Sequence, residues 1–292
     1  MTSLPVSVAV LGTGVPADRI AAAVDGRADL TLTAHRPLTE APPSGTTLVV
    51  VVPSLADDVK ALVPQLLRDA FDVISTAPPE SETEISEACV AAGRTFHSTG
   101  GFQSAVAARI TRSLAAAVRE VDHLELVEEI ALPAEGLHPW SSPSESGVGG
   151  SADAARAAAT AVAGWYTAGL RVLEEGGFGT VTDAESVVTV EVDADEWGAV
   201  HTVTATHVLD DRVTYRSVRT AGTAPLRYRL TTTTAVGRST ATVEFQPAGG
   251  VHPAEHLTAR EVLDAIRPVH ESGPGISRRD LAITYLSRDE RL

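Results

Sequence analysis

Cysteine, lysine and aromatic residues are all scarce in this chain of 292 residues. The single cysteine, Cys89, cannot form an intrachain disulfide, which favours a reducing compartment. Of the 23 basic residues only Lys60 is lysine, so a reaction that requires a lysine has one candidate. Aromatic residues make up only 4% of the chain, and most of its apolar bulk comes from alanine and valine. Because 43% of the residues are apolar, we still expect a globular fold.

Long apolar runs and clustered positive charge are missing too. The longest apolar run, Leu48–Val52, is far shorter than the ~20 residues that a membrane-spanning helix requires. The formal net charge of −15 opposes binding to nucleic acid, which contacts clustered Lys and Arg. The first residues lack the basic region of a signal peptide, and the Gly-Lys-Ser/Thr of a P-loop does not occur. We therefore expect a soluble, cytoplasmic protein with no nucleic-acid or membrane partner.

Segments typical of strands and of helices alternate over the first part of the chain. The expected strands are Val6–Leu11, Leu30–Ala34, Leu48–Val52, Val73–Thr76 and Thr95–His97. The expected helices are Ala17–Val24, Leu55–Ala70, Glu82–Ala92 and Ser104–Val121. Such alternation predicts an α/β fold with an N-terminal Rossmann domain, built on a doubly wound parallel sheet.

The second half of the chain has a different pattern. A strand, Leu124–Leu132, and an alanine-rich helix, Ala152–Glu174, precede a series of β-branched or alternating segments joined by short turns. These segments are 186–192, 200–209, 212–219, 226–234 and 239–246. They predict a C-terminal α+β domain with an open antiparallel sheet. A helix, Ala259–Ile266, and a strand-like tail, Leu281–Leu286, follow.

From these patterns we expect two domains. Residues 1–122 would form the Rossmann domain, and residues 123–257 the α+β domain. The C-terminal residues, about 258–292, would pack back on the first domain.

A glycine motif follows the first expected strand. The residues Gly12-Thr13-Gly14-Val15-Pro16-Ala17 fit the dinucleotide fingerprint G-x-G-x-x-[GA]. The glycines let the chain turn tightly and let a pyrophosphate approach backbone amides at a helix N-terminus. Pro16 is compatible with this function, because proline is favoured in the first turn of a helix. We predict that Gly12, Thr13, Gly14 and Val15 bind a nucleotide, the alternative being a purely structural turn.

The end of the second expected strand selects the cofactor in such folds. An acidic residue there would bind the ribose hydroxyls of NAD, whereas a cation accommodates the 2′-phosphate of NADP. The chain has Ala34-His35-Arg36-Pro37, with no acidic residue, and Arg36 lies 24 residues after Gly12. This arrangement favours NADP over NAD, unless Arg36 is only a solvated residue.

Two side chains are candidates for proton transfer. Glu80 follows the strand that ends near Thr76, and His97 ends the next strand along the chain. Ligands of doubly wound sheets bind beyond the carboxyl ends of the strands, which is where both residues are expected. The alternatives are a solvated glutamate and a buried, hydrogen-bonded core histidine.

The stretch His252-Pro253-Ala254-Glu255-His256 matches the metalloprotease pattern H-x-x-E-H. A zinc site of that type needs a stable helix that places both imidazoles on one face. The preceding glycines and Pro253 instead predict a loop that leads into the next helix, so we expect no metal site.

Several segments together resemble the dihydrodipicolinate reductase-like family, in the branch of 2,4-diaminopentanoate dehydrogenase and the native amine dehydrogenases. In chain order they are DVISTAPP, EACVAAGRTFHSTGGF, ELVEEIALP leading into WSSPSESGVGG, and AIRPVHESGPGISRRDLAI. The resemblance implies a Rossmann domain joined to a dimerising α+β domain, and hydride transfer between NAD(P)H and an imine or amine. It implies Arg36 at the 2′-phosphate, Ser75, Thr76 and Ala77 beside the nicotinamide, Gly100 and Gly101 against the cofactor, and His138 and Trp140 in the substrate pocket.

The chain departs from the family pattern where the chemistry is expected. Dihydrodipicolinate reductase itself uses a catalytic lysine in a histidine-rich motif, whereas the one lysine here, Lys60, lies in the first domain. Pro78-Pro79 displaces Glu80 from the strand end, and the family's Gly-x-Asn-Pro-Gly-Phe turn is shortened to Gly100-Gly101-Phe102. The hypotheses are thus an NADPH-dependent oxidoreductase acting on a small imine, ketone or amine, and a non-catalytic binding or assembly protein that keeps the fold. A third, a sugar dehydrogenase, usually requires a lysine near the strand end.

Overall fold

The computed structural model describes residues 4–115, 120–134, 136–182, 185–222, 225–247 and 251–277. They form two compact units, of which the first contains the chain up to Phe102 and again from Glu255, and the second contains Gln103–Ala254. This division places most of α4 (Gly101–Ala115) in the second unit, whereas the sequence assigns it to the first. The expected domain limits stay a prediction, and the expected tail Leu281–Leu286 lies outside the described residues.

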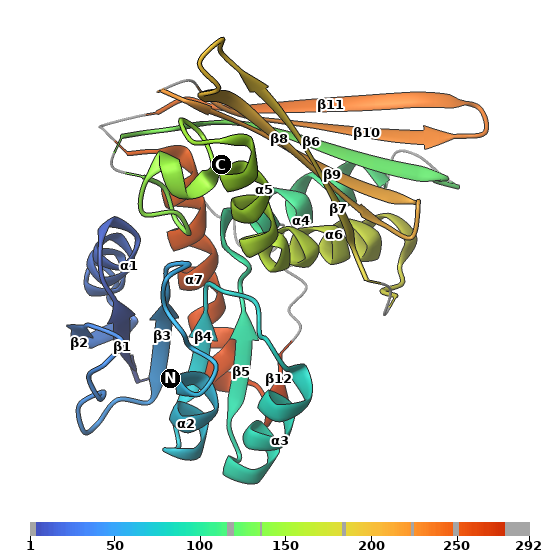
Figure 1. Ribbon diagram of the computed structural model, residues 1–292. Helices are drawn as coiled ribbons and strands as arrows, with labels where there is room; N and C mark the ends of the chain where they lie inside the picture. Colours follow the sequence, from blue (N-terminus) through green and yellow to red (C-terminus); the bar gives the residue numbers. More distant parts are fainter. Residues whose placement is uncertain are drawn as a thin grey trace. The chain divides into compact units, whose positions relative to one another are not determined.

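The first unit is built on a sheet with the strand order β12-β5-β4-β3-β1-β2 (Figure 1). All of its strand pairs are parallel. The strands are β1 (Val6–Gly12), β2 (Leu30–Arg36), β3 (Leu48–Val52), β4 (Asp72–Ser75), β5 (Thr95–Ser98) and β12 (Gly275–Ile276). Its helices are α1 (Val15–Asp25), α2 (Leu62–Arg68), α3 (Glu82–Ala92) and α7 (Pro253–Glu271).

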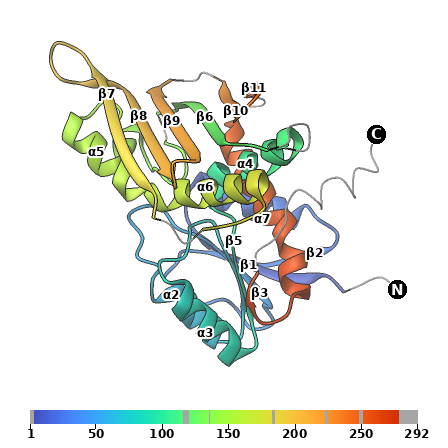
Figure 2. The ribbon, with the colours of Figure 1, turned by 90° about the vertical axis from the view of Figure 1, so that its right-hand side faces the viewer.

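Helices cover both faces of this sheet, as the apolar run of β3 predicts. Leu48, Val50 and Val52 belong to a core with residues of α1 and α7. Val49 and Val51 point the opposite way, into a core with α2 and α3. Figure 2 shows α2 and α3 on one side of the parallel strands and α7 on the other. The predicted doubly wound α/β sheet is therefore confirmed.

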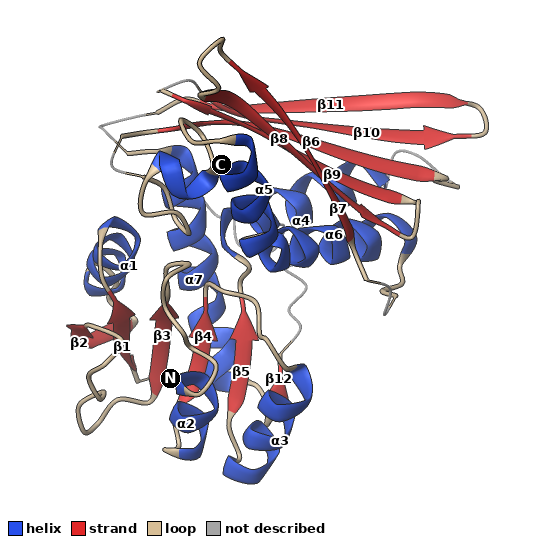
Figure 3. Cartoon of the chain, in the orientation of Figure 1, coloured by secondary structure: helices blue, strands red, loops and turns tan. Residues whose placement is uncertain are grey.

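The second unit has a six-stranded sheet of order β11-β10-β6-β9-β8-β7 (Figure 3). Its strands are β6 (His123–Leu132), β7 (Val187–Ala194), β8 (Val200–Leu209), β9 (Val213–Ala221), β10 (Leu226–Thr234) and β11 (Gly237–Phe245). All pairs are antiparallel except β6 with β9, so the expected antiparallel sheet is in fact mixed. Helices α5 (Ala152–Ala161) and α6 (Ala163–Phe178) pack on one face of it.

Several elements differ from the sequence prediction. The expected helix Leu55–Ala70 is shortened to α2, because residues 55–61 form turns instead. The expected helix Ala152–Glu174 is divided into α5 and α6, since Val162 leaves the helical conformation. Helix α7 is longer than predicted and begins at Pro253, where the missing N–H of proline costs no hydrogen bond.

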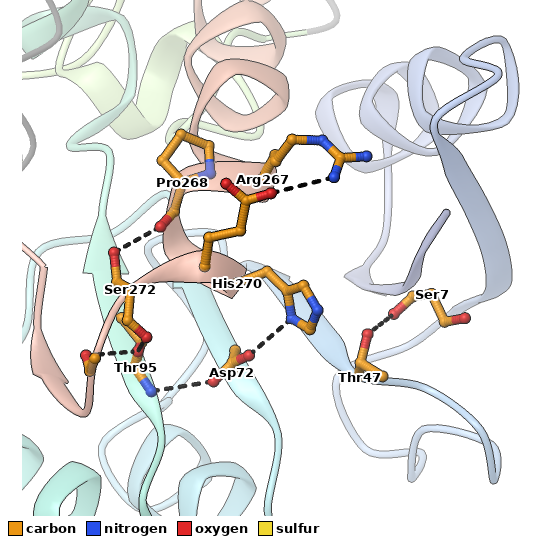
Figure 4. A network of polar contacts seen from close by, with 10 residues as sticks. Ser7, Thr47, Asp72, Thr95, Arg267, Pro268, His270 and Ser272 are labelled. Atoms are coloured by element: carbon orange, nitrogen blue, oxygen red, sulfur yellow. Dashed lines mark hydrogen bonds and ion pairs between the residues drawn. The ribbon is translucent and has the colours of Figure 1, made fainter. Parts of the chain in front are cut away.

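Polar contacts fasten the C-terminal end of α7 to the first sheet (Figure 4). The ring of His270 donates through Nδ1 to Asp72 Oδ2 at 3.2 Å, and the backbone N–H of Thr95 donates to Asp72 Oδ1 at 3.1 Å. The hydroxyl of Thr95 donates to the carbonyl oxygen of Gly273 at 3.0 Å. The buried carboxylate of Asp72, at the start of β4, thus connects the start of β5 with the end of α7, which leads into β12.

Candidate functional site

The glycine turn lies between the end of β1 and the start of α1. Gly12 has φ +148° and Gly14 has φ +82°, conformations that side chains rarely adopt. A Cβ at Gly12 would lie 2.5 Å from the carbonyl oxygen of Val52, so β3 leaves no room for one. No side chain caps the N-terminus of α1, and Pro16 occupies its first turn as predicted. The first N–H groups of the helix can therefore bind an anion.

Arg36 is the last residue of β2, where the sequence places it. Its Nη1 donates to the carbonyl oxygen of Ala41 at 3.1 Å and lies 3.8 Å from the carboxylate of Glu40. Since the side chain is 42% exposed, this ion pair is worth little. A phosphate could take the place of Glu40 at small cost.

Two Ser-Thr pairs end neighbouring strands of the first unit. Ser75 closes β4, and its Oγ accepts from the backbone N–H of Ala77 at 3.1 Å. Ser98 closes β5, and its Oγ donates to the carbonyl oxygen of Ala77 at 3.0 Å. The hydroxyls of Thr76 and Thr99 are buried without a hydrogen-bond partner. Buried hydroxyls of this kind need an explanation, and a bound group at the carboxyl edge of the sheet supplies one.

Thr99 was missed by the sequence analysis, although a signal for it exists. The dipeptide Ser98-Thr99 repeats Ser75-Thr76 at the end of the adjacent parallel strand. A short loop with two consecutive left-handed glycines follows, with φ +66° at Gly100 and +61° at Gly101. This shortened turn leads directly into α4.

The structure does not bring Glu80 and His97 together. Glu80 is exposed beside a shallow pocket that Phe96, Val63 and Pro79 also line. His97 follows Phe96 in β5, so its ring lies on the opposite face of the sheet. The ring is buried, and Nδ1 donates to the carbonyl oxygen of Ser277 at 2.7 Å. This is the contact of a hydrogen-bonded core histidine, and the catalytic role of either residue stays a prediction.

His138 and Trp140 are buried in the second unit. They lie in a tight turn in which Leu137 and Trp140 exchange backbone hydrogen bonds of 2.9 and 2.7 Å. Burial lowers the pKa of His138 to about 4, so the imidazole is neutral at pH 7. The guanidinium of Arg219 lies 5.0 Å from the Trp140 ring. The structure therefore associates the predicted Trp140 with an arginine that the sequence analysis did not identify.

A buried polar cluster occupies the same unit, and it too was missed. Glu128 of β6 is fully buried and accepts hydrogen bonds from Tyr166 (3.0 Å), Tyr215 (2.8 Å) and Ser217 (2.9 Å). Burial raises the pKa of Glu128, while these hydroxyl donors act in the opposite direction. The tyrosine pKa values are raised as well, mainly by burial and then by the nearby Glu128 charge.

Histidine and acidic residues form no metal site in the part of the chain that the structure describes, where no group of three or more such side chains gathers. Glu255 and His256, which the sequence places in a loop, instead belong to the first turns of α7. Glu255 lies 3.5 Å from Nε of Arg19, and His252 contacts the carbonyl oxygen of Ala131 at 3.2 Å. No described helix combines the length and apolar content needed to cross a membrane.

Neither a protein-family model nor a curated protein sequence matches this chain. Solved structures do resemble it. An amine dehydrogenase from Mycobacterium smegmatis has a TM-score of 0.66 and 13% identity, over 94% of this chain and 95% of that one. GenD2 from gentamicin A biosynthesis, in complex with NAD, has a TM-score of 0.61 and 14% identity, over 91% and 87%. A dipicolinate-bound dihydrodipicolinate reductase from Paenisporosarcina sp. TG-14 has a TM-score of 0.51 and 12% identity, over 94% and 97%.

These likenesses confirm the fold that the sequence predicts. The chain combines a Rossmann-type parallel sheet with a second, mostly antiparallel sheet, as those structures do. At 12 to 14% identity these likenesses show the fold alone.

Proposed function

We propose that this protein is a cytoplasmic, NADPH-dependent oxidoreductase that transfers hydride to or from a small imine, ketone or amine. The observation that carries the proposal is the glycine turn between β1 and α1. No side chain caps the start of α1, and β3 leaves no room for a side chain at Gly12. Such a turn leaves backbone N–H groups open to a pyrophosphate. The structural likeness to dehydrogenases supports it.

The residues at the carboxyl edge of the first sheet fit a nicotinamide dinucleotide. Gly12, Thr13, Gly14 and Val15 would hold the pyrophosphate, and Arg36 the 2′-phosphate. Ser75, Thr76, Ala77 and the glycine pair Gly100-Gly101 would lie against the rest of the cofactor. The buried hydroxyls of Thr76 and Thr99 offer the hydrogen-bonding capacity that a carboxamide needs. When bound, the cofactor supplies the hydride, and the protein supplies orientation and a proton.

Two residues are proposed for the proton. Glu80 is exposed at the carboxyl edge and can exchange protons with solvent. In neutral His97, Nδ1 carries the proton because its partner is a carbonyl oxygen, which can only accept.

Arg36→Ala should weaken NADPH binding by about tenfold to a hundredfold, the usual value of a charge-assisted hydrogen bond. NADH binding should be unchanged, because NADH lacks the 2′-phosphate. Fluorescence titration of both cofactors measures this. Arg68→Ala is the matched control, since Arg68 is an exposed arginine of α2 at 3.9 Å from Glu84. Absence of binding of either cofactor by the unmodified protein would reject the enzyme proposal.

Glu80→Gln should lower kcat by about a hundredfold with little change in KM, as loss of a general acid does. A panel of amines and carbonyl compounds with either cofactor measures it, and His97→Ala is assayed beside it. Glu87→Gln, an exposed glutamate of α3, is the control. Full activity in both the Glu80 and the His97 variants would reject both assignments.

The second candidate function is a binding or assembly protein without catalysis. The separation of Glu80 from His97 across the sheet favours it. This candidate predicts cofactor binding with no turnover of any member of the panel. A homodimer, which the family resemblance implies, is compatible with both functions.

A further inference from the structure

Arg219 is an unusual residue in the second unit because it has no exposed surface. It lies in β9, where Tyr215, Ser217 and Arg219 alternate with exposed or half-buried residues and share the buried face of the strand. Arginine is almost never fully buried unless its charge is matched. The partners of this guanidinium therefore show what the site is built to hold.

The guanidinium is only partly satisfied. Its Nε donates to Ser217 Oγ and its Nη1 donates to the carbonyl oxygen of Ser146, each at 3.3 Å, which is long for such bonds. Its Nη2 is buried and has no partner. Arginine carries five N–H donors, so these two weak contacts leave most of its donor capacity unused.

No carboxylate among the described residues lies within ion-pair distance of Arg219. The acid in the same cluster, Glu128, directs its oxygens to Tyr166, Tyr215 and Ser217 instead. Only the hydroxyl of Ser217 connects Glu128 with the arginine. A buried cation without a contacting anion is costly, so the site favours an anion from outside the chain.

The surroundings of Arg219 are aromatic and neutral. The guanidinium lies 5.0 Å from the ring centre of Trp140 and 5.6 Å from that of Tyr166. His207 stacks on Tyr166 at 4.6 Å, and neither of its ring nitrogens has a partner. Burial, and then the charge of Arg219, lower the pKa of His207 to about 3, so it adds no second cation at pH 7. Flat aromatic walls beside a planar guanidinium suit a small planar anion such as a carboxylate, whose two oxygens match the N–H groups of the fork.

We propose that Arg219 is the centre of an anion site that takes the carboxylate of a small oxo acid or amino acid. The Nη2 group would donate to one carboxylate oxygen. His138 lies on the turn that brings Trp140 to Arg219, and its buried Nε2 is a further polar atom without a partner. Naming this anion as the substrate's carboxylate rests on the proposed function, but the site itself does not.

Arg219 has no exposed surface, so a ligand reaches Nη2 only if residues that cover it move. The segment from Gly136 to Gly150 supplies two of the groups next to the guanidinium, Trp140 and the carbonyl oxygen of Ser146. Gly147 and Gly149 have φ of +91° and +80°. The segment also packs closely against α5, since a Cβ at Gly147 would overlap with Cα of Ala155.

The test is a calorimetric titration of the full chain with pyruvate and with pyruvamide, its neutral analogue of similar shape. We expect pyruvate to bind at least tenfold more tightly than pyruvamide, and Arg219→Met to remove that preference. Arg216→Met is the matched control, because Arg216 lies on the same strand but is exposed and pairs with Glu125 at 3.4 Å. It should leave the preference unchanged.

Three results would overturn the site. The first is equal binding of pyruvate and pyruvamide by the unmodified chain, and the second is an unchanged preference in a folded Arg219→Met variant. The third is binding of pyruvate no tighter than that of chloride, which would mean an adventitious ion only.

If Arg219→Met does not fold, the comparison of pyruvate with pyruvamide on the unmodified chain decides. NADPH is titrated into the same samples. Pyruvate preference without NADPH binding would reject the proposed function and support the anion site. NADPH binding without pyruvate preference would reject the anion site and leave the proposed function standing.

Discussion

Gly12→Ala is expected to destabilise the protein by about 3 kcal/mol and to abolish cofactor binding. The new Cβ would lie 2.5 Å from the Val52 carbonyl oxygen, which belongs to the central strand β3 and cannot move without disturbing the sheet. Overpacking of this kind costs about 1–3 kcal/mol, and a strained backbone at φ +148° adds to it. Urea unfolding and NADPH titration measure the two effects.

Gly45→Ala separates strain from close approach. Gly45 has φ +87°, but no atom lies within 4 Å of a Cβ built on it. We expect a loss of about 1 kcal/mol, from backbone conformation alone, and unchanged NADPH binding. Equal losses in the two variants would show that contact with β3 is not what requires Gly12.

Glu128→Leu is expected to cost about 3 kcal/mol or more. It removes the acceptor for three buried hydroxyls, those of Tyr166, Tyr215 and Ser217, and each buried group left unsatisfied costs about 1–3 kcal/mol. Glu125→Gln is the control on the outer face of the same strand, where an exposed ion pair with Arg216 is worth at most about 1 kcal/mol. Urea unfolding of both variants measures the difference.

Glu128→Gln gives the same cluster a pH signature. Burial raises the pKa of Glu128 in the folded chain above its ordinary value of 4.5. Between 4.5 and that raised pKa the unfolded chain has released a proton that the folded chain keeps, so the wild-type protein loses stability as pH rises. Glutamine does not titrate, so the free energy of unfolding of the variant should rise relative to that of the wild type as pH increases over this range. A constant difference from pH 4 to pH 8 would mean that the Glu128 pKa is not raised.

Local signals explain which parts of the fold could be predicted from the sequence. Helix α3 begins and ends as predicted, because Ser81 caps its start through the Glu84 N–H and Gly93 ends it in a left-handed conformation. The break at Val162 has a weaker signal, because Val162 is neither proline nor glycine and Gly164 lies two residues further along. Strand β12 was not predicted because it has two residues and forms only by pairing with Thr95 and Phe96 of β5.

The candidate site divides in the same way. The sequence could single out Gly12, Gly14 and Arg36 because the predicted cofactor motif is local. It consists of one strand, the turn that follows it and the end of the next strand. Glu128 and Arg219 could not be singled out in this way. The segment Glu125 to Glu129 contains three glutamates, and alternation places Glu128 on the face of Leu124 and Leu126, but only the structure shows that tyrosines and a serine of distant segments meet it there. Pairing between strands so distant in the chain is tertiary information that no short motif contains.

The return of α7 and β12 to the first sheet has a consequence for how the protein is made. Val262, Ile266 and Val269 of α7 complete a core shared with β1 and α1, and β12 covers the edge of β5. A ribosome that has released only residues up to Phe102 has exposed a sheet with an uncovered apolar face and an open edge. The nascent first unit must wait until residues 103–254, which separate its two parts in the chain, have been synthesised. During that interval the apolar face of the sheet and the edge of β5 stay uncovered, which is the condition under which unpaired strands aggregate.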